Sequence, residues 1–160
     1  MLFREKVIRL AYTHPHLQDH LVPMLKQGSM QDDLEWCAMT LHDGASALGL
    51  LGNYVLHNPA GNMGVATAER SIQRGEEVST LLGARTEGES IRDVLPQVGA
   101  IIRSLNKEIR DLRRCEEYLK TRGPDSERSM YRGRIHSIVQ NIAMSWRRHA
   151  DVLWRMGKEL

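Results

Sequence analysis

The spacing of apolar residues predicts a chain that is built almost wholly of helices. Apolar positions recur every three or four residues over most of the sequence, and no segment alternates apolar and polar residues for long. A spacing of three and four places apolar side chains on one side of an α-helix, whereas strict alternation is typical of a half-buried strand. The rhythm is most regular over residues 96–121 and 126–158, and a third long stretch covers residues 31–57. We therefore expect an all-α helical bundle.

The two C-terminal stretches predict a long antiparallel helical hairpin. Gly123 and Pro124 lie between them, and Gly and Pro are common where a helix ends. A connection of a few residues makes consecutive helices antiparallel neighbours. We expect aliphatic side chains to meet across this hairpin. The first helix would contribute Ile102, Leu105, Ile109 and Leu112, and the second Tyr131, Ile135, Ile138 and Ile142.

Residues 31–57 predict a helix that is rich in small residues. Its apolar positions follow the four-and-three spacing of closely packed helices. Gly44, Gly49 and Gly52 lie in this segment and would let another helix backbone come close, at a cost in helix propensity.

One Ser and one Gly predict where helices begin and end in the first half of the bundle. Ser29 is a favourable N-cap for the helix over residues 31–57, because its hydroxyl can accept a hydrogen bond from a free backbone N–H. A weaker helix is expected over residues 65–82, and Gly83 would end it.

Two short helices are expected at the N-terminus, over residues 2–12 and from Pro15 to Gly28. We interpret residues 1–28 as an N-terminal helical docking element and residues 29–160 as the helical bundle domain. The apolar side of the element would bind a partner. Its candidate docking residues are Phe3, Val7, Leu10, Leu17, Leu21 and Leu25.

The charge of the chain is divided unevenly. The net charge is only +2, which argues against a polyelectrolyte role for the whole chain. Residues 1–102 carry 8 Lys and Arg against 12 Asp and Glu, whereas residues 103–160 carry 14 against 8. This asymmetry is found in proteins that bind an acidic partner, including nucleic acid, at contacts between subunits of unlike charge, and on solvated helix faces. The candidate contacts for an acidic partner or phosphate are Arg103, Lys107, Arg110, Arg114, Arg147 and Arg148.

No group of residues predicts catalysis or metal binding. His16 and His20 can share one side of a helix, but Asp19 is the only carboxylate near them, and zinc takes three or four protein ligands. Cys37 and Cys115 fall on or beside apolar positions, where a free Cys behaves as a small apolar residue. No nucleophile motif or phosphate-binding loop occurs. We expect no enzymatic activity, no cofactor and no metal.

The N-terminal residues resemble a known leader element. Residues 6–11 read Lys-Val-Ile-Arg-Leu-Ala, residues 14–17 read His-Pro-His-Leu, and residues 21–26 read Leu-Val-Pro-Met-Leu-Lys. This is similar to a short element of many proteins from large tailed bacteriophages and environmental viral sequences. The resemblance covers residues 2–27 and departs at His14 and Gln18, where that pattern more often has Asn and Arg. It implies a virion component and carries no catalytic residue.

These patterns predict a non-enzymatic structural or assembly protein that self-associates or docks on a larger shell. The alternative is a nucleic-acid-associated helical protein that uses the basic C-terminal half. The longest mainly apolar stretch, residues 44–56, falls short of the ~20 residues that span a membrane, so we expect no membrane span. A phage origin would place the protein in the virion or the host cytoplasm, and any other origin in the cytoplasm. The heptad pattern leaves open whether the helices pair within one chain or between chains.

Overall fold

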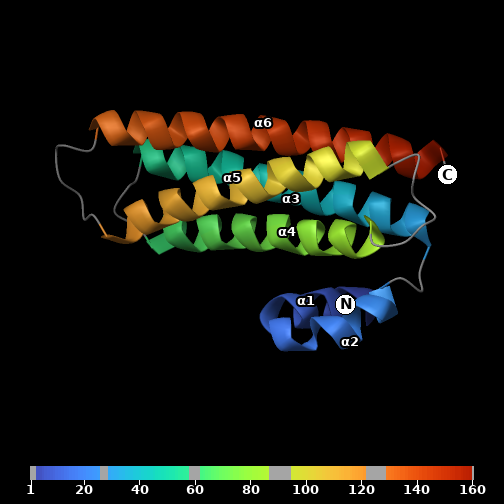
Figure 1. Cartoon of the computed structure of the whole chain (residues 1–160). Helices are drawn as coiled ribbons and strands as arrows, with labels where there is room; N and C mark the ends of the chain where they lie inside the picture. Colours follow the sequence, from blue (N-terminus) through green and yellow to red (C-terminus); the bar gives the residue numbers. More distant parts are fainter. Residues whose placement is uncertain (1–2, 26–28, 58–61, 87–94, 122–128, 160) are drawn as a thin grey trace.

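The computed structural model of the chain describes residues 3–25, 29–57, 62–86, 95–121 and 129–159 (Figure 1). Within these ranges every residue lies in a helix except His14 and Ser29. The all-α prediction is confirmed. The elements are α1 (Phe3–Thr13), a short 3₁₀ helix η1 (Pro15–Leu17), α2 (Gln18–Leu25), α3 (Met30–His57), α4 (Asn62–Thr86), α5 (Leu95–Thr121) and α6 (Ser129–Glu159).

Helices α3 to α6 form a four-helix bundle in which each helix runs antiparallel to the next, while α1 and α2 lie beside α4 (Figure 1). Helix α3 packs against both α6 and α4, and α5 packs mainly against α4. The consecutive helices α5 and α6 are antiparallel, as expected, but they contact each other much less than α3 contacts α6. The most extensive pairing of the bundle is therefore between its first and last helices.

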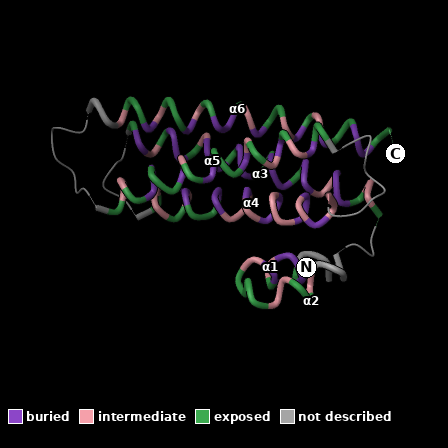
Figure 2. Tube along the Cα trace, in the orientation of Figure 1, coloured by how far each residue is buried: buried purple, intermediate pink, exposed green. Residues whose placement is uncertain are grey.

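The heptad positions of α3 line the core. Figure 2 shows the buried positions of the four long helices directed toward the bundle interior. Burying one large aliphatic side chain contributes about 1.5–3 kcal/mol, so this row is a major source of stability. The buried positions of α3 on this row are Leu34, Ala38, Leu41, Ala45, Leu48, Gly52 and Val55.

The predicted pairing across α5 and α6 is wrong at Ile138. This side chain is 38% exposed, whereas the adjacent Val139 is fully buried. Helix α6 packs chiefly on α3 and only slightly on α5, so α5 does not cover every aliphatic position of α6. Leu105, Leu112 and the other aliphatic residues of the expected pairing pack in the common core. The side chain of Tyr131 lies outside the part that the structure describes.

The glycines of α3 make room for side chains rather than for a helix backbone. A Cβ added at Gly44 would lie 2.7 Å from the indole ring of Trp146, and one added at Gly75 of α4 would also lie 2.7 Å from it. Gly52 faces the side chain of Gln140, while Gly49 has no neighbouring atom within 4 Å. Fully buried Trp146 of α6 therefore lies between two glycines, one on α3 and one on α4.

The predicted helix ends have different outcomes. The Ser29 prediction is confirmed, because its Oγ accepts a hydrogen bond from the Asp32 backbone N–H at 3.3 Å. The prediction that Gly83 ends a helix is wrong, since α4 continues to Thr86. Buried Ala84 holds this last turn against the core, and Thr86 Oγ1 donates to the Gly83 carbonyl. Among the described helices, none is long and apolar enough to cross a membrane.

Candidate docking and anion-binding surfaces

The N-terminal element docks on the chain's own bundle. Val7, Ile8 and Ala11 of α1 are buried, and Val7 and Ile8 belong to the same apolar core as Leu81 of α4. Both α1 and α2 contact α4. Part of the predicted docking side is therefore already covered within one chain.

The candidate docking residues do not form one exposed surface. Val7 is buried, Leu10 is exposed, and Leu17 and Leu21 are half-buried, with Leu21 packed against the core. The side chains of Phe3 and Leu25 lie outside the described part of the structure.

Polar contacts also hold α1 on α4. The Arg9 guanidinium lies 3.7 Å from the buried carboxylate of Glu77. Tyr12 hydrogen-bonds Glu76, and its pKa is raised chiefly by burial and then by this carboxylate. Apolar spacing alone gave no sign of these partners, because a buried Glu on α4 is indistinguishable in sequence from a solvated one.

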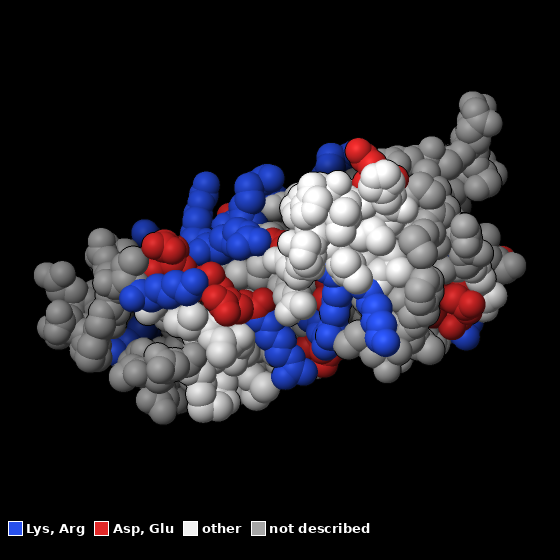
Figure 3. All heavy atoms as spheres, turned by 90° about the horizontal axis from the view of Figure 1, so that it is seen from below, with Lys and Arg blue, Asp and Glu red and all other residues white. Residues whose placement is uncertain are grey.

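Carboxylates of the first half are largely neutralised within the chain. Figure 3 shows Lys and Arg adjoining Asp and Glu on the face that carries α1 and α2. Among the described side chains of residues 1–102, Asp19 and Asp32 are the acidic residues without an ion pair. The pairs are Asp33 with Arg85, Glu35 with Lys158, Asp43 with Arg70 and Arg74, Glu69 with Lys120, Glu76 with Arg113, and Glu77 with Arg9 and Arg74.

Four of the predicted cations form a row on the outer side of α5. Arg103, Lys107, Arg110 and Arg114 are exposed, and their spacing of four, three and four residues places them on one side of the helix. Arg114 lies 3.9 Å from Asp111, while the other three have no ion pair with a described residue. We call these four residues the cation row.

The remaining predicted cations lie elsewhere. Arg147 and Arg148 are exposed on α6 and also lack an ion pair with a described residue. Arg113 stands next to the cation row in sequence but turns toward α4, where it pairs with Glu76.

A polar cluster joins α5 to α6. His149 Nε2 lies 3.1 Å from the hydroxyls of Ser104 and Ser145, and 3.4 Å from a carboxylate oxygen of Glu108. The Ser104 hydroxyl donates to Glu108 at 2.9 Å. A catalytic Ser-His-acid relay uses both nitrogens of the imidazole, whereas one nitrogen makes all these contacts here. The cluster therefore links α5 to α6 through polar contacts.

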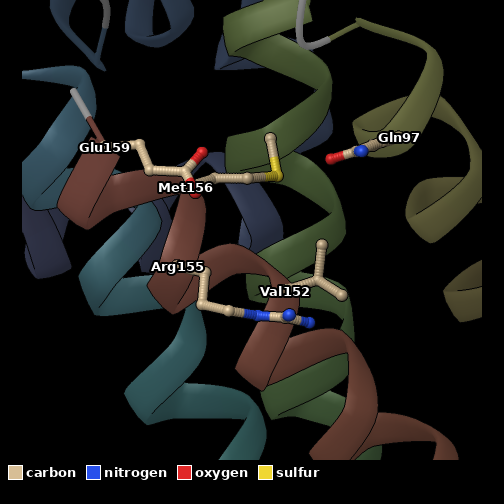
Figure 4. A pocket seen from close by; sticks show the side chains of 5 residues that line it. All are labelled: Gln97, Val152, Arg155, Met156 and Glu159. Atoms are coloured by element: carbon tan, nitrogen blue, oxygen red, sulfur yellow. The ribbon is translucent and has the colours of Figure 1, made fainter.

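A small cavity opens at the end of the bundle where α5 begins and α6 ends (Figure 4). Its volume of about 190 Å³ is below the range of about 300–1,000 Å³ that is usual for small-molecule sites. The lining residues are Gln97, Val152, Arg155, Met156 and Glu159.

The two cysteines are buried thiols. Burial raises the pKa of Cys115 to about 11, and the nearby charge of Asp111 acts in the same direction. A thiol with this pKa is protonated at neutral pH and is a poor nucleophile. Cys37 is buried as well. Across the described residues, no group of three or more His, Cys, Asp and Glu side chains is placed to hold a metal ion.

Comparisons with protein families, with curated proteins and with solved structures find no match to this chain. A proposal for its function rests on the surfaces described above.

Proposed function

We propose that the protein is a non-enzymatic structural or assembly protein that self-associates or docks on a larger shell, as a virion component does. Large apolar side chains on the outside of two adjacent helices support this proposal. Met39 and Leu50 of α3 are 65% and 55% exposed, and Met144 of α6 is 55% exposed. Exposed apolar side chains that gather on one surface are typical of protein–protein contacts.

The three side chains lie within about three helical turns of one another along the bundle. Met39 and Leu50 are eleven residues apart, which is close to three full turns, so they share one side of α3. Gly44 is level with Trp146 and Gly52 is level with Gln140. Met144 is therefore level with α3 between these glycines, within about two turns of each of the other two. We call Met39, Leu50 and Met144 the apolar surface.

Light scattering during size exclusion tests self-association through this surface. We expect a mass above the 18.2 kDa of one chain that rises with concentration. The double variant Met39→Lys/Leu50→Lys should return the protein to one chain, because a buried ammonium would oppose the contact. Met63→Lys is the matched control, since Met63 is 62% exposed on α4. A single-chain mass at every concentration would contradict the proposal.

A second candidate function is association with nucleic acid through the basic C-terminal half. The exposed, largely unpaired cations of α5 and α6 favour it. Titration of a labelled DNA duplex tests this candidate, and we expect binding at low salt that weakens steeply as salt is added.

A further inference from the structure

We infer that the cation row of α5 binds the phosphate backbone of double-stranded nucleic acid without reading its sequence. This inference rests on the second candidate function and names the site and the ligand chemistry for it. Arg103 and Arg114 stand at the ends of the row, about 16 Å apart along the helix axis. Duplex DNA carries one negative charge for about every 1.7 Å of its own axis, so several phosphates fall within this span.

The cations of the row are available because the fold does not use them. The cations that face α4 from α5, Arg113 and Lys120, are paired with carboxylates of that helix. The buried Glu108 and Glu116 of α5 point away from the row, toward His149 and Lys120 respectively. Asp111 lies 3.9 Å from the end residue Arg114, which is 83% exposed. Glu117 follows Arg114 by three residues on the same side of α5, beyond the end of the row.

Within the described residues, the first half of a second copy of the chain does not offer a matching acidic surface. The carboxylates of the first half could have supplied one, but six of the eight whose side chains are described already pair within the chain. The two others, Asp19 and Asp32, lie on different helices, α2 and α3. The charge asymmetry of the sequence therefore points to a ligand from outside the protein.

Phosphate fits the row better than an acidic protein does. Protein interfaces usually combine arginine with aromatic anchors and an apolar centre, and no described side chain of α5 is at once large, apolar and exposed. Three of the four cations are arginines, whose planar guanidinium can bind two oxygens of one phosphate.

A duplex fits better than a single strand. Proteins that bind single strands stack the bases on aromatic side chains. The single aromatic residue of α5, Tyr118, is half-buried. Without stacking, the contacts that a row of outward cations offers are chiefly to the phosphate backbone, and these are independent of sequence.

The test measures how binding of a short labelled DNA duplex depends on salt, by fluorescence anisotropy. Four phosphate contacts predict a slope of log affinity against log salt of about −3.6, which is a loss of about 150-fold between about 50 and 200 mM salt. Arg103→Gln/Lys107→Gln should reduce that loss to about 12-fold, because two contacts remain. Lys6→Gln/Arg70→Gln removes the same charge from exposed positions of α1 and α4 and should leave the slope unchanged. Arg147→Gln/Arg148→Gln measures separately whether the α6 cations contribute to the slope.

The outcomes distinguish a failure of the nucleic-acid function from a failure of its assignment to the cation row. No binding of duplex by the unsubstituted protein at low salt would overturn the nucleic-acid function itself. Binding with an equal slope in Arg103→Gln/Lys107→Gln, or with the slope reduced only in Arg147→Gln/Arg148→Gln, would overturn the assignment to the cation row alone. Equal affinity for polyglutamate, or tighter binding of single strands of the same length, would overturn the duplex as its ligand. Circular dichroism of each variant confirms that the bundle is intact.

Discussion

Trp146 explains the glycines at Gly44 and Gly75 in two long helices. Glycine weakens a helix by about 1 kcal/mol relative to alanine, so each of these positions carries a cost. The fully buried indole of α6 occupies the volume that their Cβ atoms would need. The sequence revealed that small residues recur in α3, but it could not reveal that their partner is a side chain from a helix one hundred residues later.

Alanine at either contact glycine should destabilise the fold. The added Cβ of Gly44→Ala or Gly75→Ala would lie 2.7 Å from the indole, and such overpacking costs about 1–3 kcal/mol, more than the gain in helix propensity. Gly49→Ala is the control, because it meets no atom within 4 Å and should stabilise the helix by up to about 1 kcal/mol. Urea unfolding of the three variants measures this. Equal effects at Gly44 and Gly49 would show that the indole does not constrain α3.

At the scale of the elements, the long helices were predictable and their neighbours were not. The apolar rhythm located α3 and α5 within one residue at each end, because every turn repeats the same signal. The same rhythm could not tell which pair of helices would pack most closely, since aliphatic side chains fit any apolar partner. Loop length suggested α5 with α6, yet α6 packs chiefly on α3.

Leu112 and Ile138 should respond differently to truncation, although their sequence patterns are alike. Leu112 is fully buried, so Leu112→Ala should cost about 2–5 kcal/mol. Ile138 is 38% exposed, and we expect Ile138→Ala to cost about 1 kcal/mol or less. Thermal unfolding of both variants measures the difference. Comparable losses would place Ile138 in a closed hairpin core, contrary to the structure.

The small N-terminal element should open without unfolding the bundle. Ile8 is buried in the contact of α1 with α4, and Ile8→Ala should cost about 2 kcal/mol or more at that contact. We expect faster hydrogen exchange in α1 and α2, with little change in α3 to α6, because short elements with few buried contacts can open locally. Leu10→Ala, at an exposed position of the same helix, serves as the control. Faster exchange throughout the bundle would mean that α1 is part of one cooperative unit.

At the scale of the whole molecule, the paired charges and the unpaired cations differ in position. The ion pairs of the first half join α3 to α4, α4 to α5 and α1 to α4, so they serve the fold. The described cations of the second half without an ion pair point outward on α5 and α6. The apolar surface lies on α3 and α6. Composition predicted the surplus of cations in the second half. Which of them remain unpaired depends on carboxylates of another helix, and spacing along one helix carries no information about that.

Oxidation of the exposed methionines tests the assembly proposal most directly. Met39 and Met144 belong to the apolar surface, whereas Met63 is equally exposed on α4 and serves as an internal control. The unsubstituted protein, at a low and at a high protein concentration, is treated with the same dilute peroxide. Mass spectrometry then measures the rate at which each methionine is converted to its sulfoxide. The account predicts that Met39 and Met144 oxidise more slowly at high concentration while the rate at Met63 stays constant. Unchanged rates at Met39 and Met144 would contradict self-association through this surface.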